Sequence, residues 1–119
     1  MQRKKFTFKK INKLKSKKSY QFVYGKGRTV VDPLSVFYIL ADQGEDVKIG
    51  VAGGKKLGCA VVRNRVKRLM REVFRMHQAQ LKKGYHIVWV ARQKLTKADL
   101  KTFERVFLRL VKRAALLQE

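Results

Sequence analysis

Most of the side chains that could act chemically in this sequence are cations, and they are densest between Lys55 and Arg75. This stretch contains one acidic residue, Glu72. A solvated helix usually mixes both signs of charge at i,i+4 spacing, so a run with almost no acid indicates a polyanionic partner. Arginine presents planar pairs of N–H donors that suit phosphate oxygens. The chemistry predicted for this stretch is therefore phosphate binding, with nucleic acid as the first candidate partner.

An α-helix would sort the stretch into two faces. Apolar residues recur at three- and four-residue steps, which places them on one side of a helix; they are Val62, Val66, Leu69, Met70 and Val73. Polar residues recur at the same steps on another side: Asn64, Arg68, Arg71 and Arg75, with Arg63 and Lys67 in a flanking row and Arg65 beside Arg68. We predict a helix from about Ala60 to Leu81 that buries the first face and exposes the second.

The composition of the whole chain agrees with a polyanion-binding protein. The chain has 119 residues, a net charge of +22 and 45% hydrophobic residues, which suits one domain with a modest core that works beside a polyanion. A single cysteine, no signal segment and no bilayer-spanning apolar run predict a cytoplasmic protein. We expect one domain over residues 1–119, in which residues 1–15 form a basic N-terminal arm.

The elements that must position the cations follow from periodicity and turn residues. Helices are predicted over residues 16–24, at the central stretch and from about residue 100, the last with Thr96–Asp99 as a capping box. Strands are predicted over residues 28–31, 35–41, 47–52 and 85–91. The polar turn at residues 42–46 predicts that the second and third strands form a hairpin, and the strand at 85–91, apolar on both faces, predicts an interior position. The order α-β-β-β-α-β-α predicts an α+β fold, a mixed four-stranded sheet flanked by helices.

The central motif also resembles a known family. Lys-Lys-Leu-Gly-Cys-Ala-Val-Val-Arg-Asn-Arg-Val-Lys-Arg, from Lys55 to Arg68, is similar to the most specific stretch of the protein subunit of bacterial ribonuclease P. Residues 20–27, with two tyrosines before Gly27, resemble the first-helix pattern of that family, and residues 36–38 resemble its second strand. The resemblance covers residues 10–115 and implies an α/β sandwich with a left-handed βαβ crossover.

The resemblance implies an RNA-binding subunit of the ribonucleoprotein that removes the 5′ leader from precursor tRNA. In that family the catalytic RNA carries out the hydrolysis and uses Mg²⁺, so no catalytic residue, metal ligand or cofactor is expected in the protein. The residues implied to meet the catalytic RNA are Arg63, Asn64, Arg65, Lys67, Arg68 and Arg71. The residues implied to form the cleft for the single-stranded leader of precursor tRNA are Tyr20, Tyr24, Val36 and Tyr38 at its floor, with Lys56, Val62, Arg63 and Asn64 at its side. Neither a membrane nor DNA is expected as a partner.

Three positions depart from the residues usual in that family. Ser35 stands where phenylalanine is common, and residues 52–54 replace a Ser-x-Ser sequence. Cys59 stands where asparagine is frequent at the expected start of the central helix. Because asparagine is among the best N-cap residues, the cysteine predicts a weaker helix cap.

Composition alone leaves three other functions open. A general RNA-binding module of ribosomal or RNA-chaperone type would carry the same charge without an enzyme role. A free-standing metal-dependent nuclease needs clustered carboxylates or histidines; Asp42, Glu45 and Asp46 share a turn, while His77 and His86 lie on different predicted elements. Attachment to an anionic membrane through the amphipathic last helix is the third alternative, although its apolar stripe is expected to cover the sheet.

Overall fold

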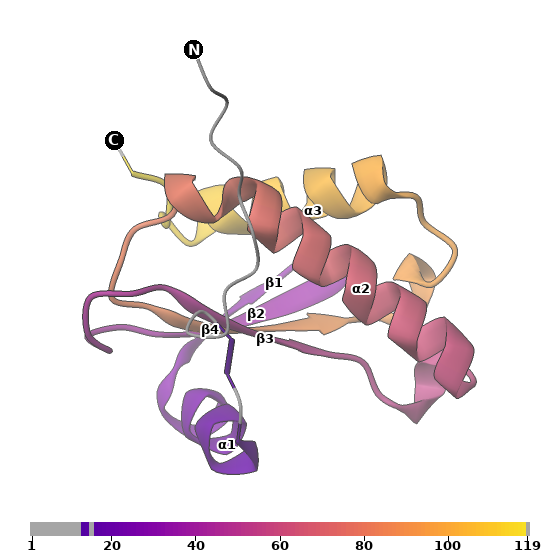
Figure 1. Ribbon diagram of the computed structural model, residues 1–119, viewed down its shortest axis with the longest axis horizontal. Coiled ribbons are helices and arrows are strands. Elements are labelled where there is room, and N and C mark those ends of the chain that lie inside the picture. Colours follow the sequence, from indigo (N-terminus) through magenta and orange to yellow (C-terminus); the bar gives the residue numbers. More distant parts are fainter. Residues whose placement is uncertain (1–12, 15, 119) are drawn as a thin grey trace.

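The computed structural model describes residues 13–14 and 16–118. In chain order the main elements are α1 (Lys17–Lys26), β1 (Arg28–Val31), β2 (Ser35–Leu40), β3 (Lys48–Ala52), α2 (Ala60–His77), β4 (His86–Ala91) and α3 (Leu100–Arg113), with short 3₁₀ turns at Lys55–Leu57, Gln78–Gln80 and Gln93–Leu95. The strands form one sheet, with α1 on one face and α2 and α3 on the other (Figure 1). The predicted α+β fold is confirmed. Most of the predicted basic arm, residues 1–12 and residue 15, lies outside the described residues.

The strand order β1-β2-β4-β3 corrects the predicted hairpin. β2 and β3 do not pair, because β4 lies between them, antiparallel to β2 and parallel to β3. The hairpin is instead formed by β1 and β2. Ile87, Val88 and Trp89 are fully buried, as expected of a strand that is apolar on both faces. The loop after β2 passes the start of β4, where Gln43 N–H donates to Gly84 O (2.9 Å).

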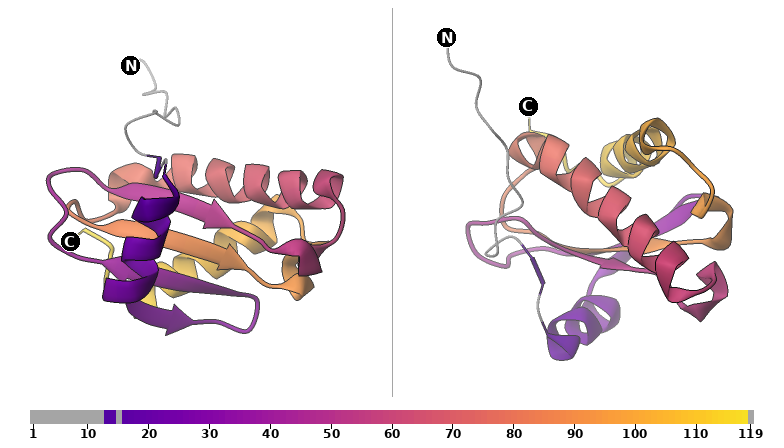
Figure 2. Two further views of the ribbon diagram at one scale, coloured as in Figure 1. Left: turned by 90° about the horizontal axis from the view of Figure 1, so that it is seen from below. Right: turned by 45° about the vertical axis from the view of Figure 1, so that its right-hand side comes forward.

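The unit β3–α2–β4 is the parallel βαβ crossover that the resemblance implies. Its left hand stays a prediction. Because β3 and β4 are parallel, their carboxyl ends meet at the same edge of the sheet. The chain enters α2 from that edge, which places the cationic stretch beside the ends of both strands (Figure 2).

The larger part of the core fills the space between the sheet and the helices α2 and α3. Trp89 is fully buried and contacts the rings of Phe37, Phe103 and Phe107. Its indole Nε1–H donates to Ser35 Oγ (2.8 Å), and Ser35 is itself fully buried. The serine that departs from the family's usual phenylalanine therefore satisfies a polar atom inside the core, where an unpaired indole N–H would be unfavourable.

A smaller cluster lies on the opposite face, under α1. Leu14, Val23 and Val88 are buried there, and Tyr20 and Tyr38 pack against them. α1 runs across the strands and covers only part of this face (Figure 2). The tyrosines of α1 and β2 therefore lie at the border between the core and solvent.

The end of α2 and the cap of α3 differ from the sequence-based expectation, and α1 continues past its predicted end at residue 24 to Lys26. α2 ends at His77 and continues as a 3₁₀ turn to Gln80, a tightening that is common at helix ends. The predicted capping box at Thr96–Asp99 is wrong, because Asp99 is itself the N-cap of α3 and its Oδ1 accepts from Thr102 N–H (3.0 Å). Thr96 instead donates its hydroxyl to Gln93 O (2.8 Å).

Candidate nucleic-acid interface

α2 has the two faces that the spacing predicts. Val66, Met70, Val73 and Phe74 are buried against the sheet and α3. The helix begins after Cys59, whose side chain makes no cap hydrogen bond, as expected from the cysteine at this position. The nearby backbone N–H groups of Val62 and Val61 lower the pKa of the exposed Cys59 thiol. The amino end of the helix is therefore an electropositive place without an acidic side chain in its first turn.

The predicted RNA-facing residues other than Arg65 form the α2 basic face, which we define as Arg63, Asn64, Lys67, Arg68 and Arg71. Asn64 and Arg68 are exposed, whereas Arg63, Lys67 and Arg71 are half-buried. The Nε atom of Arg63 is buried and has no hydrogen-bond partner among the described residues. A buried donor without an acceptor needs a physical explanation, and the described residues do not provide one.

Arg65 lies apart from this face. Its Nη1 donates to Thr96 O and its Nη2 to Ala98 O, both at 3.0 Å. These bonds fasten the loop that precedes α3 to α2. The guanidinium that the resemblance implies for RNA contact thus already satisfies two backbone carbonyls of the chain.

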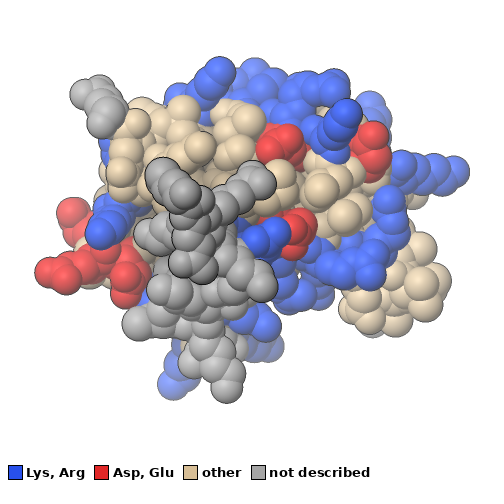
Figure 3. Space-filling model, turned by 45° about the horizontal axis from the view of Figure 1, so that its top comes forward, with Lys and Arg blue, Asp and Glu red and all other residues tan. Residues whose placement is uncertain are grey.

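Glu72, the acid within the cationic stretch, is neutralised locally. Its carboxylate forms an ion pair with Arg75, with an Nε–Oε2 distance of 3.1 Å. The hydrogen bond from Arg75 also holds the pKa of Glu72 below its ordinary value. Lysine and arginine cover much of the surface that α2 and α3 form above the sheet, and acidic side chains are few there (Figure 3).

A hollow of about 460 Å³, which we call the tyrosine hollow, lies between α1, the ends of the strands and α2. Its lining residues are Tyr20, Tyr24, Val51, Ala52, Gly53, Gly54, Lys67, Arg71 and Val90. Two tyrosines predicted for the leader cleft and two cations predicted for the catalytic RNA thus share one hollow. This combination of aromatic faces and cations is typical of sites that bind unpaired nucleic acid.

The remaining floor residues lie next to this hollow. The rings of Tyr24 and Tyr38 meet edge to face, with centroids 4.7 Å apart. Val36 pairs with Val90 in the sheet and is buried. The structure therefore brings Tyr20, Tyr24, Val36 and Tyr38 to one side of the sheet.

Gly50 positions Tyr20 and was not among the predicted site residues. A Cβ atom added at Gly50 would lie 2.5 Å from Tyr20 Cζ, far inside van der Waals contact. The ring of Tyr20 therefore packs directly on the backbone of β3. Glycine inside a strand often marks such a close approach, which is the signal that could have identified it.

The phenols of the hollow remain protonated at neutral pH. Burial raises the pKa of Tyr20 and of Tyr24 above the ordinary value near 10. Arg71 acts on Tyr20 in the opposite direction without reversing the shift. Neutral hydroxyl groups do not repel a phosphate, so the hollow keeps its net positive charge.

Lys56 and Val62 lie at the amino end of α2, outside the lining of the tyrosine hollow. Lys56 is exposed and lines a second hollow of about 520 Å³ together with Gly54, Leu57, Ala91, Arg92 and Gln93. Val62 is half-buried and packs against the core. The cation Arg92 at this second hollow was not predicted as a site residue.

Two further findings bear on the alternative functions. In residues 13–14 and 16–118, no three His, Cys, Asp or Glu side chains gather into a group that could hold a metal ion. No helix in this part of the chain is long and apolar enough to cross a membrane. The amphipathic α3 buries its apolar stripe, including Phe103, Phe107 and Leu110, against the sheet.

Comparisons with known proteins agree with one another. A family model described as Ribonuclease P matches residues 8–115. The ribonuclease P protein component of Symbiobacterium thermophilum is 40% identical over 111 residues, which cover 92% of this chain and 96% of that protein. The corresponding protein of Caldanaerobacter subterraneus subsp. tengcongensis is 38% identical over 110 residues, which cover 92% and 95%.

Solved structures give the same answer for the fold. The RNase P protein of Staphylococcus aureus matches with a TM-score of 0.82 and 27% identity, over 90% of this chain and 98% of that one. The RNase P protein from Thermotoga maritima matches with a TM-score of 0.78 and 27% identity, over 85% and 96%. The chain therefore belongs to the ribonuclease P protein family, and its role is that of an RNA-binding subunit of a tRNA-processing ribonucleoprotein enzyme.

Proposed function

We propose that this protein docks on the ribonuclease P RNA through the α2 basic face and holds the 5′ leader of precursor tRNA in the tyrosine hollow. The observation that carries the proposal is the hollow itself, in which Tyr20 and Tyr24 face the same space as Lys67 and Arg71. Stacking on an aromatic face accepts any base, and cations neutralise the phosphates between bases. The hollow is thus suited to a single strand of varied sequence.

Docking through α2 is supported by the exposure of its cations to solvent. Arg68 is exposed, so its guanidinium is free to donate hydrogen bonds to a phosphate of the RNA subunit. Charge-assisted hydrogen bonds from guanidinium to phosphate are short and directional, so this face would set the register of docking.

In this proposal the protein supplies binding and the RNA subunit supplies the reaction. Mg²⁺ belongs to the RNA subunit, and the protein improves metal use by neutralising phosphates near the cleavage site. The cytoplasm is the expected compartment, because the exposed free thiol of Cys59 suits a reducing environment.

Reconstitution tests the proposal directly. Bacterial ribonuclease P RNA and precursor tRNA are combined at limiting Mg²⁺, with and without the protein. We expect cleavage at the mature 5′ end only when the RNA subunit and the protein are both present. A protein that is folded, binds several RNAs and gives no stimulation would instead be a general RNA-binding module.

Two substitutions separate the two binding roles. Arg68→Ala should weaken binding to the RNA subunit, since Arg68 is exposed on the α2 basic face. Tyr38→Ala should weaken binding of precursor tRNA to the assembled enzyme and leave mature tRNA binding unchanged, because only the precursor has a leader. Equal losses for the two tRNAs would contradict the assignment of Tyr38 to the leader.

A further inference from the structure

The outward face of α3 carries a second set of cations that neither proposed site uses. The exposed cations of this helix are Lys101, Arg105, Arg109, Lys112 and Arg113. At about 100° per residue they fall within about 120° of the helix circumference. Glu104 is the only acid in α3, and its Oε2 lies 2.6 Å from His77 Nε2 on α2. Within the helix the outward face therefore carries no acid, and the nearest carboxylates are the exposed N-cap Asp99 and the buried Asp32.

Some of these cations fasten the helix to the edge strand β1. Arg109 binds both carboxylate oxygens of Asp32, through Nε at 3.0 Å and Nη2 at 3.1 Å. Arg113 Nη1 donates to Val31 O (2.7 Å), and Arg28 Nη2 donates to Ala114 O (2.6 Å). These bonds hold β1 and α3 in a fixed relation.

The other three cations of α3 form no bond to β1. The side chains of Lys101, Arg105 and Lys112 make no hydrogen bond or salt bridge with any other residue that the structure describes, although Arg105 acts electrostatically on Asp99. They stand at positions i, i+4 and i+11, which is one row along the helix. We call this row, together with the flanking Arg28 and Arg113, the α3 basic face.

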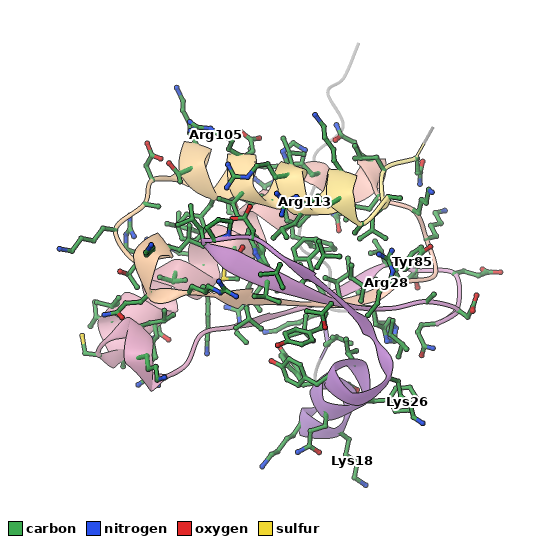
Figure 4. The ribbon with its side chains drawn as sticks, turned by 180° about the vertical axis from the view of Figure 1, so that it is seen from behind. Lys18, Lys26, Arg28, Tyr85, Arg105 and Arg113 are labelled. Atoms are coloured by element: carbon green, nitrogen blue, oxygen red, sulfur yellow. The ribbon has the colours of Figure 1, made fainter. Side chains whose placement is uncertain are left out.

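The α3 basic face lies away from the other two sites. In the view from behind, α3 stands in front and carries Arg105 and Arg113, with Arg28 of β1 below them (Figure 4). Lys18 and Lys26 lie on α1, on the opposite face of the sheet (Figure 4). In Figure 1, by contrast, α2 lies in front of α3. A single RNA segment seated on α2 would therefore leave the α3 basic face uncovered.

The row also places like charges next to each other. Lys101 and Arg105 are four residues apart, as are Arg105 and Arg109, and like charges at this spacing destabilise a helix. A partner that is bound throughout the life of the protein would relieve this repulsion, whereas a substrate that leaves after each turnover would relieve it only briefly. This argument favours the RNA subunit over precursor tRNA.

The absence of aromatic rings from this face indicates which form of RNA fits. The exposed large hydrophobic side chains of the described residues are Phe22, Tyr24, Val31 and Val61. Both exposed aromatic residues belong to α1, and the aromatic residues of α3 are buried, so the row on α3 offers no ring on which an unpaired base could stack. Cations without stacking partners bind the phosphate backbone of helical RNA, which is recognised mainly by shape and by contacts to its phosphates and 2′-hydroxyls.

We infer that the α3 basic face binds the backbone of a double-helical segment of the ribonuclease P RNA, separate from the segment that α2 contacts. This inference rests on the proposed docking of the RNA subunit and deepens it. The protein would then join two parts of its RNA partner through α2 and α3, which lie on the same face of the sheet (Figure 1).

A charge-matched pair of triple variants tests the inference. Lys101→Ala/Arg105→Ala/Lys112→Ala removes three cations from α3, and Lys17→Ala/Lys18→Ala/Lys26→Ala removes three exposed cations from α1. Binding to the ribonuclease P RNA without substrate is measured over a range of salt concentrations. Each lost phosphate contact should lower the log–log salt slope by about 1, so we expect the slope to fall by about 3 for the α3 variant and to stay near that of the unmodified protein for the α1 variant.

The outcomes separate this inference from the proposed function. Equal losses for the two variants would reduce the effect to net charge and overturn the inference, as would an unchanged slope for the α3 variant. Weaker binding of mature tRNA to the holoenzyme, with unchanged binding of the RNA subunit, would place the tRNA body on α3 and also overturn it. Arg68→Ala reports on α2 docking alone, so its failure would count against the proposed function and not against the α3 face.

A tethered cleavage reagent tests the form of the RNA. The variant Arg105→Cys is made in a Cys59→Ser background, so that the protein has a single cysteine. An iron chelate is then attached to that cysteine. Hydroxyl radicals from this site should cut both strands of a paired segment of the RNA subunit. Cuts confined to unpaired nucleotides would contradict the helical partner.

Discussion

The ion pair between Asp32 and Arg109 predicts that removing one of the two charges lowers the stability of the fold more than removing both. Asp32 is 1% exposed, lies in the turn between β1 and β2, and accepts hydrogen bonds from Arg109 and from the Leu34 N–H (3.0 Å). Burial alone would raise the pKa of Asp32, but these hydrogen bonds hold it below its ordinary value. Removing the arginine should therefore be more harmful than removing both charges.

The size of each stability change depends on which buried groups the substitution leaves without a partner. Arg109→Ala leaves a buried carboxylate with only the Leu34 N–H as a described hydrogen-bond donor, and breaking a buried pair in this way costs about 3 kcal/mol at the lower end of the usual range. We take the lower end because the Arg109 side chain is 44% exposed. Asp32→Asn added to Arg109→Ala removes the buried charge and should recover about 1–2 kcal/mol.

The contribution of Asp32 to the free energy of unfolding changes with pH in a predictable direction. In the unmodified protein the folded-state pKa of Asp32 is depressed, so its contribution is fully present above the unfolded value near 3.9 and is lost as the pH falls through the lower folded value. In Arg109→Ala the pKa should rise above the unfolded value, because burial remains and the guanidinium is gone. The penalty of that variant is then relieved as the pH falls, and the stability difference from the unmodified protein narrows.

Urea denaturation followed by circular dichroism at about pH 7 and about pH 3.5 measures both effects. The comparison uses differences between variants, so the self-repulsion of a chain with a net charge of +22 affects all of them similarly. An Arg109→Ala penalty that is equal at both pH values would refute the reasoning. So would a double variant that is less stable at neutral pH than Arg109→Ala alone.

Three further predictions concern α2 and the tyrosine hollow. Gly50→Ala should displace the ring of Tyr20 and weaken binding of precursor tRNA several-fold in a competition assay, while binding to the RNA subunit stays unchanged. Cys59→Ser should raise the free energy of unfolding by about 1 kcal/mol, because serine caps the helix, whereas Cys59→Ala should give no gain in the same thermal melt. Lys67→Ala should weaken binding of both RNA partners in separate titrations, since Lys67 belongs to the α2 basic face and lines the hollow; a loss for one partner only would assign it to that partner.

Periodicity was sufficient to predict the elements that position the site. β1 has the predicted bounds, Arg28–Val31, and the interior place of β4 follows from apolar residues on both of its faces. The two faces of α2 were visible in the spacing of Val66, Met70 and Val73 against the cations. Each of these features depends on neighbours in the chain, which is the information that a sequence pattern contains.

Features that depend on distant contacts were not predictable in this way. The polar turn at residues 42–46 is compatible with a hairpin and equally with a loop past the start of β4, and only the pairing of β4 decides between them. Arg65 has the same spacing as the other cations of α2, yet its guanidinium meets carbonyl groups more than thirty positions later in the chain. The packing of Tyr20 on Gly50 likewise joins two elements whose relation no local pattern encodes.

The position of Lys67 and Arg71 connects the two binding roles, although the resemblance implies contact with the catalytic RNA alone for these two residues. Both side chains rise from the α2 basic face, yet both line the hollow that contains Tyr20 and Tyr24. A segment of the RNA subunit seated on Arg68 would lie within one helical turn of these two cations. Its phosphates would compete with those of the leader for the same positive charge unless the two strands approach from different sides. The opposite placement of α1 and α2 about the sheet provides this separation, because the leader can lie on the tyrosines while the RNA subunit lies on the outer surface of α2 (Figure 1).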